Sequence, residues 1–196
     1  MIGLGTIINA GAIVVGGLLG LLLKNALPQR ISDTLTKAIG ICVLFIGLSG
    51  ALQNMFTIED GALSVGGTMM TIFSFIGGSI LGGALDLEGR LERFGVWLRK
   101  RAGADGDSGF LNGFLTASLT VCIGAMAVVG AINDGLFGDI SLLVTKSILD
   151  AIIIMVMSAT MGKGCIFSAI PVALFQGLVT LFARFLQPVV TAQATS

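Results

Sequence analysis

The sequence predicts an all-α membrane protein, a polytopic helical bundle, and three observations favour that fold class. The chain has 196 residues, of which 55% are hydrophobic and only 11% are charged, whereas about 25% of a typical soluble domain is charged. Long uncharged runs separate clusters of charged residues. The sign of these clusters changes from one gap to the next, as expected of loops on opposite sides of a membrane. We therefore expect a single transmembrane domain over residues 1–196.

Five uncharged runs are each long enough to cross a bilayer, because a helix needs about 20 apolar residues to span roughly 30 Å of hydrocarbon. Barrel strands would have about ten residues of alternating polarity, which these runs do not show. A further segment contains Lys146 and Asp150, so its assignment as a span rests on charge topology. The six expected transmembrane helices are residues 3–23, 35–56, 63–85, 109–132, 140–162 and 165–186.

The distribution of basic residues predicts the orientation of these spans. If the N-terminus lies outside, nine of the eleven Lys and Arg residues fall in inner loops, and the outer loops hold only acidic charges. Because Lys and Arg collect in cytoplasmic loops, the pattern favours an N-out, C-out protein. The first run has no basic segment before it and no cleavage site, so it reads as a span rather than a removed signal peptide.

A weak internal repeat relates successive pairs of spans. The spacing of Gly16 and Gly20 in the first span recurs at Gly78 and Gly82 in the third. Both are small-xxx-small patterns, which let helix backbones approach closely. Glycines at such positions also permit helix breaks beside a pathway. We expect three two-helix repeats related by duplication, an organisation that is common in transporter folds.

The largest inner loop contains its own helical pattern. Leu91, Phe94 and Leu98 recur at helical spacing, while Arg and Lys residues occupy the other faces. This arrangement predicts an amphipathic helix over about residues 87–101, lying on the inner membrane surface. Acidic residues interleave with the basic ones, which argues against a nucleic-acid partner.

Lys146 and Asp150 are the strongest candidate site residues. They are four residues apart, so they lie on one face of a helix, and Asp150 falls near the middle of its span. A charge there costs several kcal/mol unless it is paired, hydrated or neutralised. Two interpretations remain open: a structural ion pair, and a cation or proton site in which Lys146 competes with the ion or gates it.

Other polar side chains lie at a similar depth. Gln176 is near the middle of the sixth span and Asn9 is in the outer half of the first, and Pro171 is expected to free a backbone carbonyl near Phe167. Amides, carbonyls and carboxylates are oxygen ligands that suit a hard cation. Each polar residue could instead make an ordinary interhelical hydrogen bond.

The outer turn between the fourth and fifth spans is acidic. Asn133 and Asp134 precede it and Asp139 follows it. These residues could form an acidic mouth that concentrates cations, or an ordinary solvated turn with a helix cap.

Several functions are disfavoured by what the chain lacks. It has no His and no Tyr, which removes the commonest proton shuttles and metal ligands. The three cysteines show no paired spacing, so they read as small hydrophobic residues. No nucleotide-binding loop follows a strand. We expect no enzyme activity, no metal site and no cofactor.

The motifs together resemble one known family. Gly124-Ala-Met-Ala-Val-Val-Gly-Ala-Ile-Asn-Asp-Gly135, Lys146-Ser-Ile-Leu-Asp150 and Phe175-Gln-Gly177 are similar to motifs of the YqgA-like family of bacterial inner-membrane proteins. The resemblance covers nearly the whole chain. It implies a multi-pass protein of the inner (plasma) membrane, with activity as a sodium channel or pump, or an influence on biofilm formation, as the functions to expect.

These observations lead to a small membrane transporter or channel for a monovalent cation, sodium or proton, as the first functional hypothesis. Asp150 would be the ion-site carboxylate, Gln176 and Asn9 auxiliary ligands, and Lys146 an internal counter-cation. The alternatives are a non-transporting scaffold that acts on biofilm formation through partners, and a carrier of a small organic anion that contacts Lys146. Six short-looped helices form a small body, so a homo-oligomer is expected.

Overall fold

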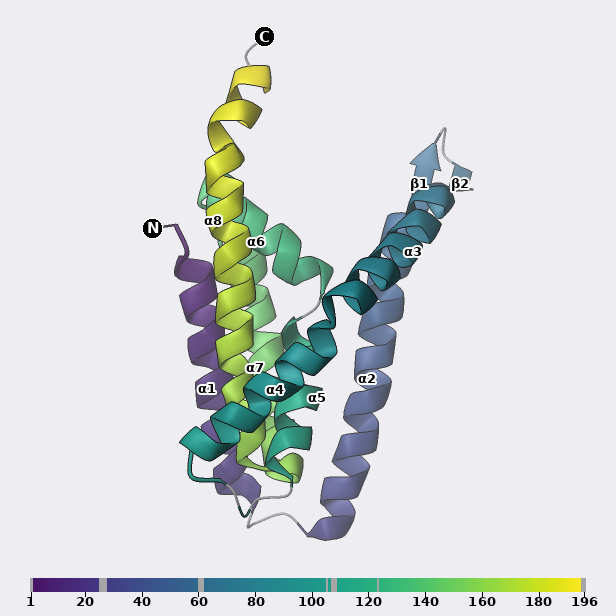
Figure 1. Cartoon of the computed structure of the whole chain (residues 1–196). Helices are drawn as coiled ribbons and strands as arrows, with labels where there is room; N and C mark the ends of the chain where they lie inside the picture. Colours follow the sequence, from purple (N-terminus) through teal and green to yellow (C-terminus); the bar gives the residue numbers. More distant parts are fainter. Residues whose placement is uncertain are drawn as a thin grey trace.

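The computed structural model describes residues 2–24, 28–59, 62–104, 106, 109–122 and 124–194. In this part of the chain, helices account for nearly all regular structure, and the exception is one short antiparallel hairpin (Figure 1). The elements are α1 Leu4–Lys24, α2 Gln29–Met55, β1 Phe56–Glu59, β2 Ala62–Val65, α3 Thr68–Leu85, α4 Leu87–Arg101, α5 Phe110–Cys122, α6 Ala125–Phe137, α7 Ser141–Met161, the 3-10 helix η1 Lys163–Ser168, and α8 Ala169–Ala194.

The chain is a multi-pass membrane protein. By length and composition, four helical segments among the described residues could cross a membrane: α1, α3, α7, and η1 continued by α8 to Phe185. The bent pair of α5 and α6 brings the number to five if the pair is one span. The second expected span, residues 35–56, coincides with α2, which has 27 residues and side chains that lie partly outside the described ones.

The fourth expected span differs most from the structure. Residues 109–132 were expected to form one helix, but α5 ends at Cys122 and α6 begins at Ala125, with a bend of 59° between them. Gly124, at the start of α6, has an extended backbone, and glycine weakens a helix interior by about 1 kcal/mol relative to alanine. The bend lets α6 lie against α8: a Cβ on Gly135 would fall 2.5 Å from the Thr180 carbonyl oxygen.

Helices α1 and α7 pack with their backbones in close contact. A Cβ atom on Gly16 would lie 2.3 Å from the carbonyl oxygen of Ala151, and one on Gly20 would lie 2.0 Å from that of Met155. Since real side chains do not reach such distances, only glycine fits at these two positions. The close backbone approach expected of the first small-xxx-small pattern is confirmed.

The corresponding glycines of the repeat behave differently. A Cβ on Gly78 or on Gly82 would meet nothing within 4 Å, and α3 has no buried residue. In Figure 1, α2 and α3 stand beside the group formed by α1, α7 and α8. The glycine pattern in α1 therefore packs against α7. The same pattern in α3 meets no neighbour among the residues that the structure describes.

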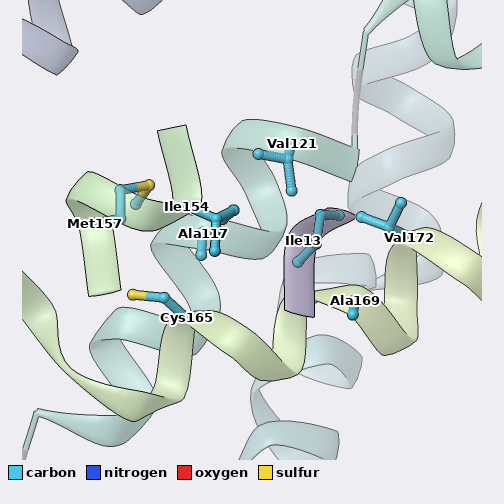
Figure 2. Packing of buried hydrophobic residues seen from close by; sticks show 8 residues of the cluster. All are labelled: Ile13, Ala117, Val121, Ile154, Met157, Cys165, Ala169 and Val172. Atoms are coloured by element: carbon cyan, nitrogen blue, oxygen red, sulfur yellow. The ribbon is translucent and has the colours of Figure 1, made fainter. Parts of the chain in front are cut away.

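The apolar core lies where α1, α5, α7, η1 and α8 meet. Figure 2 shows eight buried side chains there, contributed by all five elements. They are Ile13, Ala117, Val121, Ile154, Met157, Cys165, Ala169 and Val172. The two thiols in this region, on Cys122 and Cys165, are free, which agrees with their interpretation as small hydrophobic residues. This core fixes the positions of the helices that carry the polar residues described below.

Helix α4 matches the expected amphipathic helix at residues 87–101. Its apolar residues Leu91, Phe94 and Leu98 pack against Phe110 and Phe114 at the start of α5. Part of its apolar stripe is therefore covered by protein, while Trp97 stays 56% exposed; the position of this helix at the membrane surface stays a prediction.

Candidate functional site

A buried ion pair lies at the centre of α7. Lys146 Nζ donates a hydrogen bond to Asp150 Oδ2, and the two side chains are only 7% and 6% exposed. Both residues lie on the face of α7 that points into the bundle, and Asp150 is near the middle of this 21-residue helix. The structure thus places two oppositely charged groups in the apolar interior, where removal of either partner leaves an uncompensated charge.

The lysine also contacts the broken span. Lys146 Nζ donates a second hydrogen bond, of 2.8 Å, to the carbonyl oxygen of Val121. Since α5 ends at Cys122, this carbonyl is among the last four of its helix and has no intrahelical N–H partner. A cation at a helix C-terminus also interacts favourably with the helix dipole. The ammonium of Lys146 therefore joins α7 to the point at which the span breaks.

The freed carbonyl was expected elsewhere. Pro171 lies in the first turn of α8, which starts at Ala169, and in a first turn the missing N–H of proline removes no helical hydrogen bond. The break occurs instead at Gly124. A glycine in the middle of an apolar run was the available sequence signal, but many other glycines in this chain lie inside unbroken helices.

Two amides continue the polar cluster across α1 and α8. Asn9 and Gln176 are fully buried, and Asn9 Nδ2 donates to Gln176 Oε1 over 3.2 Å. The Asn9 side chain also lies close enough to the Asp150 carboxylate to interact with it electrostatically. Four of the six predicted site residues therefore lie in one polar cluster, which includes side chains from α1, α7 and α8 and the end of α5.

Some buried polar atoms on α1, α5 and α8 have no protein partner. Asn9 Oδ1, Gln176 Nε2 and Ser118 Oγ make no hydrogen bond within the described part of the chain, although all three side chains are fully buried. Ser118 lies one turn before Val121 on α5, so it faces the same side of that helix. A buried polar atom left without a partner costs about 1–3 kcal/mol, and such atoms usually hold water or a polar ligand.

The remaining two predicted residues lie apart from this cluster. Asp134 is fully buried, and its two carboxylate oxygens accept the backbone N–H groups of Gly3, at 3.0 Å, and Gly5, at 3.2 Å. It therefore caps the N-terminus of α1 rather than lining an open mouth. Asn133, the residue before Asp134 in α6, is half-buried.

Asp139 is the exposed acid of the outer turn. Its Oδ1 accepts hydrogen bonds from the hydroxyl of Ser141, at 2.6 Å, and from the backbone N–H of the same residue, at 2.9 Å. The hydroxyl hydrogen bond, then the backbone one, lowers the pKa of the Asp139 carboxyl. Asp139 thus caps the start of α7 as an ionised group, as the cap interpretation of this turn expected.

Comparison with known proteins identifies a family and two bacterial relatives. Residues 4–196 match the family described as "Protein of unknown function (DUF554)". The chain is 28% identical over 183 residues to "Uncharacterized membrane protein YdfK" of Bacillus subtilis, an alignment that covers 93% of this chain and 74% of that protein. It is 25% identical over 195 residues to "Uncharacterized protein YqgA" of Escherichia coli, with coverages of 96% and 77%. The resemblance drawn from the motifs is confirmed.

No solved structure matches this chain.

Proposed function

Since the chain belongs to the DUF554 family, which it matches over residues 4–196, we propose that it is a small integral membrane transporter or channel for a monovalent cation, with Asp150 as the ion-site carboxylate. The observation that carries this proposal is the buried Lys146–Asp150 pair beside the break in a membrane-crossing segment.

The position of the pair favours a working site over a purely structural one. Apolar side chains hold helices together at lower cost, and replacing a buried ion pair by well-packed hydrophobic residues is often neutral or stabilising. Ionisable residues inside a membrane are expensive and commonly mark ion pathways. Irregular backbone at membrane depth occurs where it is buried in protein or lines a cavity, and broken helices form the ion sites of many transporters.

The ligands around Asp150 support a cation rather than an anion. The Asp150 carboxylate and the Val121 carbonyl offer oxygen atoms at one position, and the unpartnered oxygens of Asn9 and Ser118 on the neighbouring helices offer more; hard monovalent cations prefer such ligands. Lys146, the only buried cationic side chain among the described residues, is already engaged with two acceptors. A carrier of a small organic anion would need that ammonium for its substrate.

We also assign the topology as six spans with both termini outside. The start of α1 and the end of α8 lie toward the same end of the molecule as the β1–β2 hairpin (Figure 1), and α2, at 27 residues, is long enough to cross a bilayer. The inner membrane is the location this topology suits, because the basic loops then face the cytoplasm.

A homo-oligomer follows from α3. This helix is apolar enough to cross a membrane, yet none of its residues is buried within the chain. The equivalent glycine pattern in α1 packs directly on a neighbouring backbone. A second copy of the chain would supply a partner of the same kind for α3.

The proposal is tested by ion flux in proteoliposomes under sodium, potassium and proton gradients. The wild-type protein is expected to dissipate one of these gradients, and Asp150→Asn is expected to abolish that flux. Asp86→Asn is the matched control, since it makes the same chemical change at a 60% exposed side chain whose left-handed backbone suits asparagine.

Equal flux in wild type and Asp150→Asn, with both proteins folded, would remove Asp150 from the mechanism. If wild type moves none of the three cations, the scaffold role becomes the better explanation.

A further inference from the structure

We infer that the ammonium of Lys146 occupies the position of the transported alkali cation, so that the lysine and the cation bind Asp150 in turn and exclude one another. This inference rests on the proposed function and specifies how its site works. The lysine is then a tethered cation that fills the site whenever the mobile ion is absent.

The two acceptors of Lys146 form the first part of the argument. Its Nζ atom bonds both a carboxylate oxygen of Asp150 and the main-chain carbonyl oxygen of Val121. A carboxylate and a carbonyl freed at a helix end are typical ligands of an alkali cation. An ammonium group carries the same single charge and seeks the same oxygen atoms, so it can substitute for a metal ion there.

Two buried oxygen atoms on neighbouring helices do not serve the lysine. Asn9 Oδ1 has no protein partner, and it belongs to an amide that interacts electrostatically with Asp150. Ser118 Oγ also lacks a partner, one turn before Val121 on α5. The ammonium bonds two oxygen atoms. A dehydrated metal ion needs more ligands than an ammonium, and these two oxygen atoms are the candidates to supply them.

Charge balance explains why occupation alternates. Among the described residues, the buried charged side chains are Asp134, Lys146 and Asp150, and Asp134 is committed to the N-terminus of α1. One carboxylate therefore balances one cation at a time. Binding both cations would leave an excess positive charge in a low-dielectric interior, and releasing both would leave a bare carboxylate.

The tether makes the exchange possible without refolding. Lys146 is on the same helix as Asp150, one turn away, and its side chain is a flexible four-carbon stem with a compact ammonium head. The head can leave the carboxylate while α7 stays in place. Each release of the mobile cation then returns the ammonium to Asp150, which gives a carrier with alternating occupancy rather than a continuously open pore.

The test measures cation-dependent thermal stability of the full-length protein in detergent. The melting temperature is recorded in lithium, sodium, potassium and choline chlorides at one ionic strength and neutral pH. Wild type is expected to respond less to these salts than Lys146→Gln, because its own ammonium competes for the site. Lys146→Gln, which leaves Asp150 unpaired, is expected to melt lower in choline and to regain several degrees in one alkali salt, since a ligand that binds only the folded state stabilises it.

The double variant Lys146→Gln/Asp150→Asn is the control for general salt effects, and it is expected to show no response. The inference is overturned if Lys146→Gln does not respond to any alkali cation, if wild type responds as strongly, or if the double variant responds equally. Proton flux that depends on Asp150, together with an unresponsive Lys146→Gln, would reject the inference while leaving the proposed function intact.

A second variant keeps the test decisive if Lys146→Gln does not fold. Lys146→Arg retains the positive charge, but its guanidinium has five donors, binds carboxylates in a fixed fork and does not deprotonate. A folded Lys146→Arg protein is expected to lose at least about tenfold in flux, because the tethered cation no longer leaves the site readily. Wild-type flux in Lys146→Arg would contradict the inference, whereas absence of flux in wild type itself would contradict the proposed function.

Discussion

Asp134 joins the second half of the broken span to the first helix. Its carboxylate accepts backbone N–H groups from Gly3 and Gly5, residues more than 125 positions earlier in the chain. The first N–H groups of a helix have no intrahelical partner, and the helix dipole places partial positive charge there. The buried carboxylate of Asp134 accepts hydrogen bonds from these N–H groups, and its negative charge balances the partial positive charge of the helix end.

Replacing Asp134 by alanine should therefore destabilise the protein. We expect a loss of about 2 kcal/mol, the scale of hydrogen bonds to charged groups, seen as a lower melting temperature in detergent. Asp139→Ala is the comparison, because Asp139 caps α7 from an exposed position and should cost less. Equal losses in the two variants would argue against a special role for the buried cap.

The residues of the candidate site were predictable as individuals and not as a cluster. Charge in an apolar segment identifies Lys146 and Asp150, and depth along a span identifies Asn9 and Gln176. Neither signal specifies that Asn9 hydrogen-bonds Gln176 and interacts electrostatically with Asp150, because that arrangement depends on how α1, α7 and α8 are rotated about their axes. For Asp134 the sequence suggested a cap, but the helix that it caps is distant in the chain.

At the scale of whole elements, two helices carry the same glycine spacing with opposite surroundings. In α1 the glycines are pressed against the backbone of α7, while in α3 they face open space within the chain. Sequence spacing alone predicts close approach in both. The packing partner, which decides the consequence of a substitution, comes only from the tertiary structure.

Leucine substitutions at equivalent glycines should separate folding from association. Gly20→Leu is expected to abolish the folded protein, because its Cβ would lie 2.0 Å from the Met155 carbonyl oxygen. Gly82→Leu is expected to leave a folded chain and to reduce cross-linking between copies, since α3 would lose its close-packing face. Yield and elution in detergent measure folding, and chemical cross-linking in membranes measures association.

Normal folding of Gly20→Leu would contradict the α1–α7 packing. Unchanged cross-linking in Gly82→Leu would reject association through α3.

The bend between α5 and α6 could not be predicted from amino-acid composition. Residues 109–132 contain a continuous apolar run, and such a run is equally compatible with a straight span and with two bent halves. The helix ends flanked by charge or by positive-φ glycine were easier to predict. Helix α4, for example, begins and ends at residues 87 and 101, as expected from its amphipathic pattern.

The topology of the whole molecule is open to a direct test. Asp139→Cys and Lys163→Cys are placed in a chain whose three native cysteines are replaced by alanine, and intact cells are treated with a membrane-impermeant maleimide. Labelling is expected at position 139 and, because the two positions flank α7, only after cell lysis at position 163. Both residues are exposed in the structure, so access to the reagent depends on the membrane alone.

Labelling of both positions in intact cells would show that α7 does not cross the membrane. Labelling of position 163 alone would invert the orientation derived from the basic loops.

The pairing of α1 with α7 has a consequence for biosynthesis. Helix α1 is synthesised before α7, so it finds its main partner only after residues from 141 onward have been made. During most of translation, α1 therefore sits in the bilayer with its close-packing surface in contact with lipid. The helix that completes it is also the one with Lys146 and Asp150, whose insertion is costly until Asn9, Gln176 and Val121 surround the charges. Each of these two helices thus depends on the other for its final state, and we expect a nascent chain arrested before α7 to leave the packing surface of α1 uncovered.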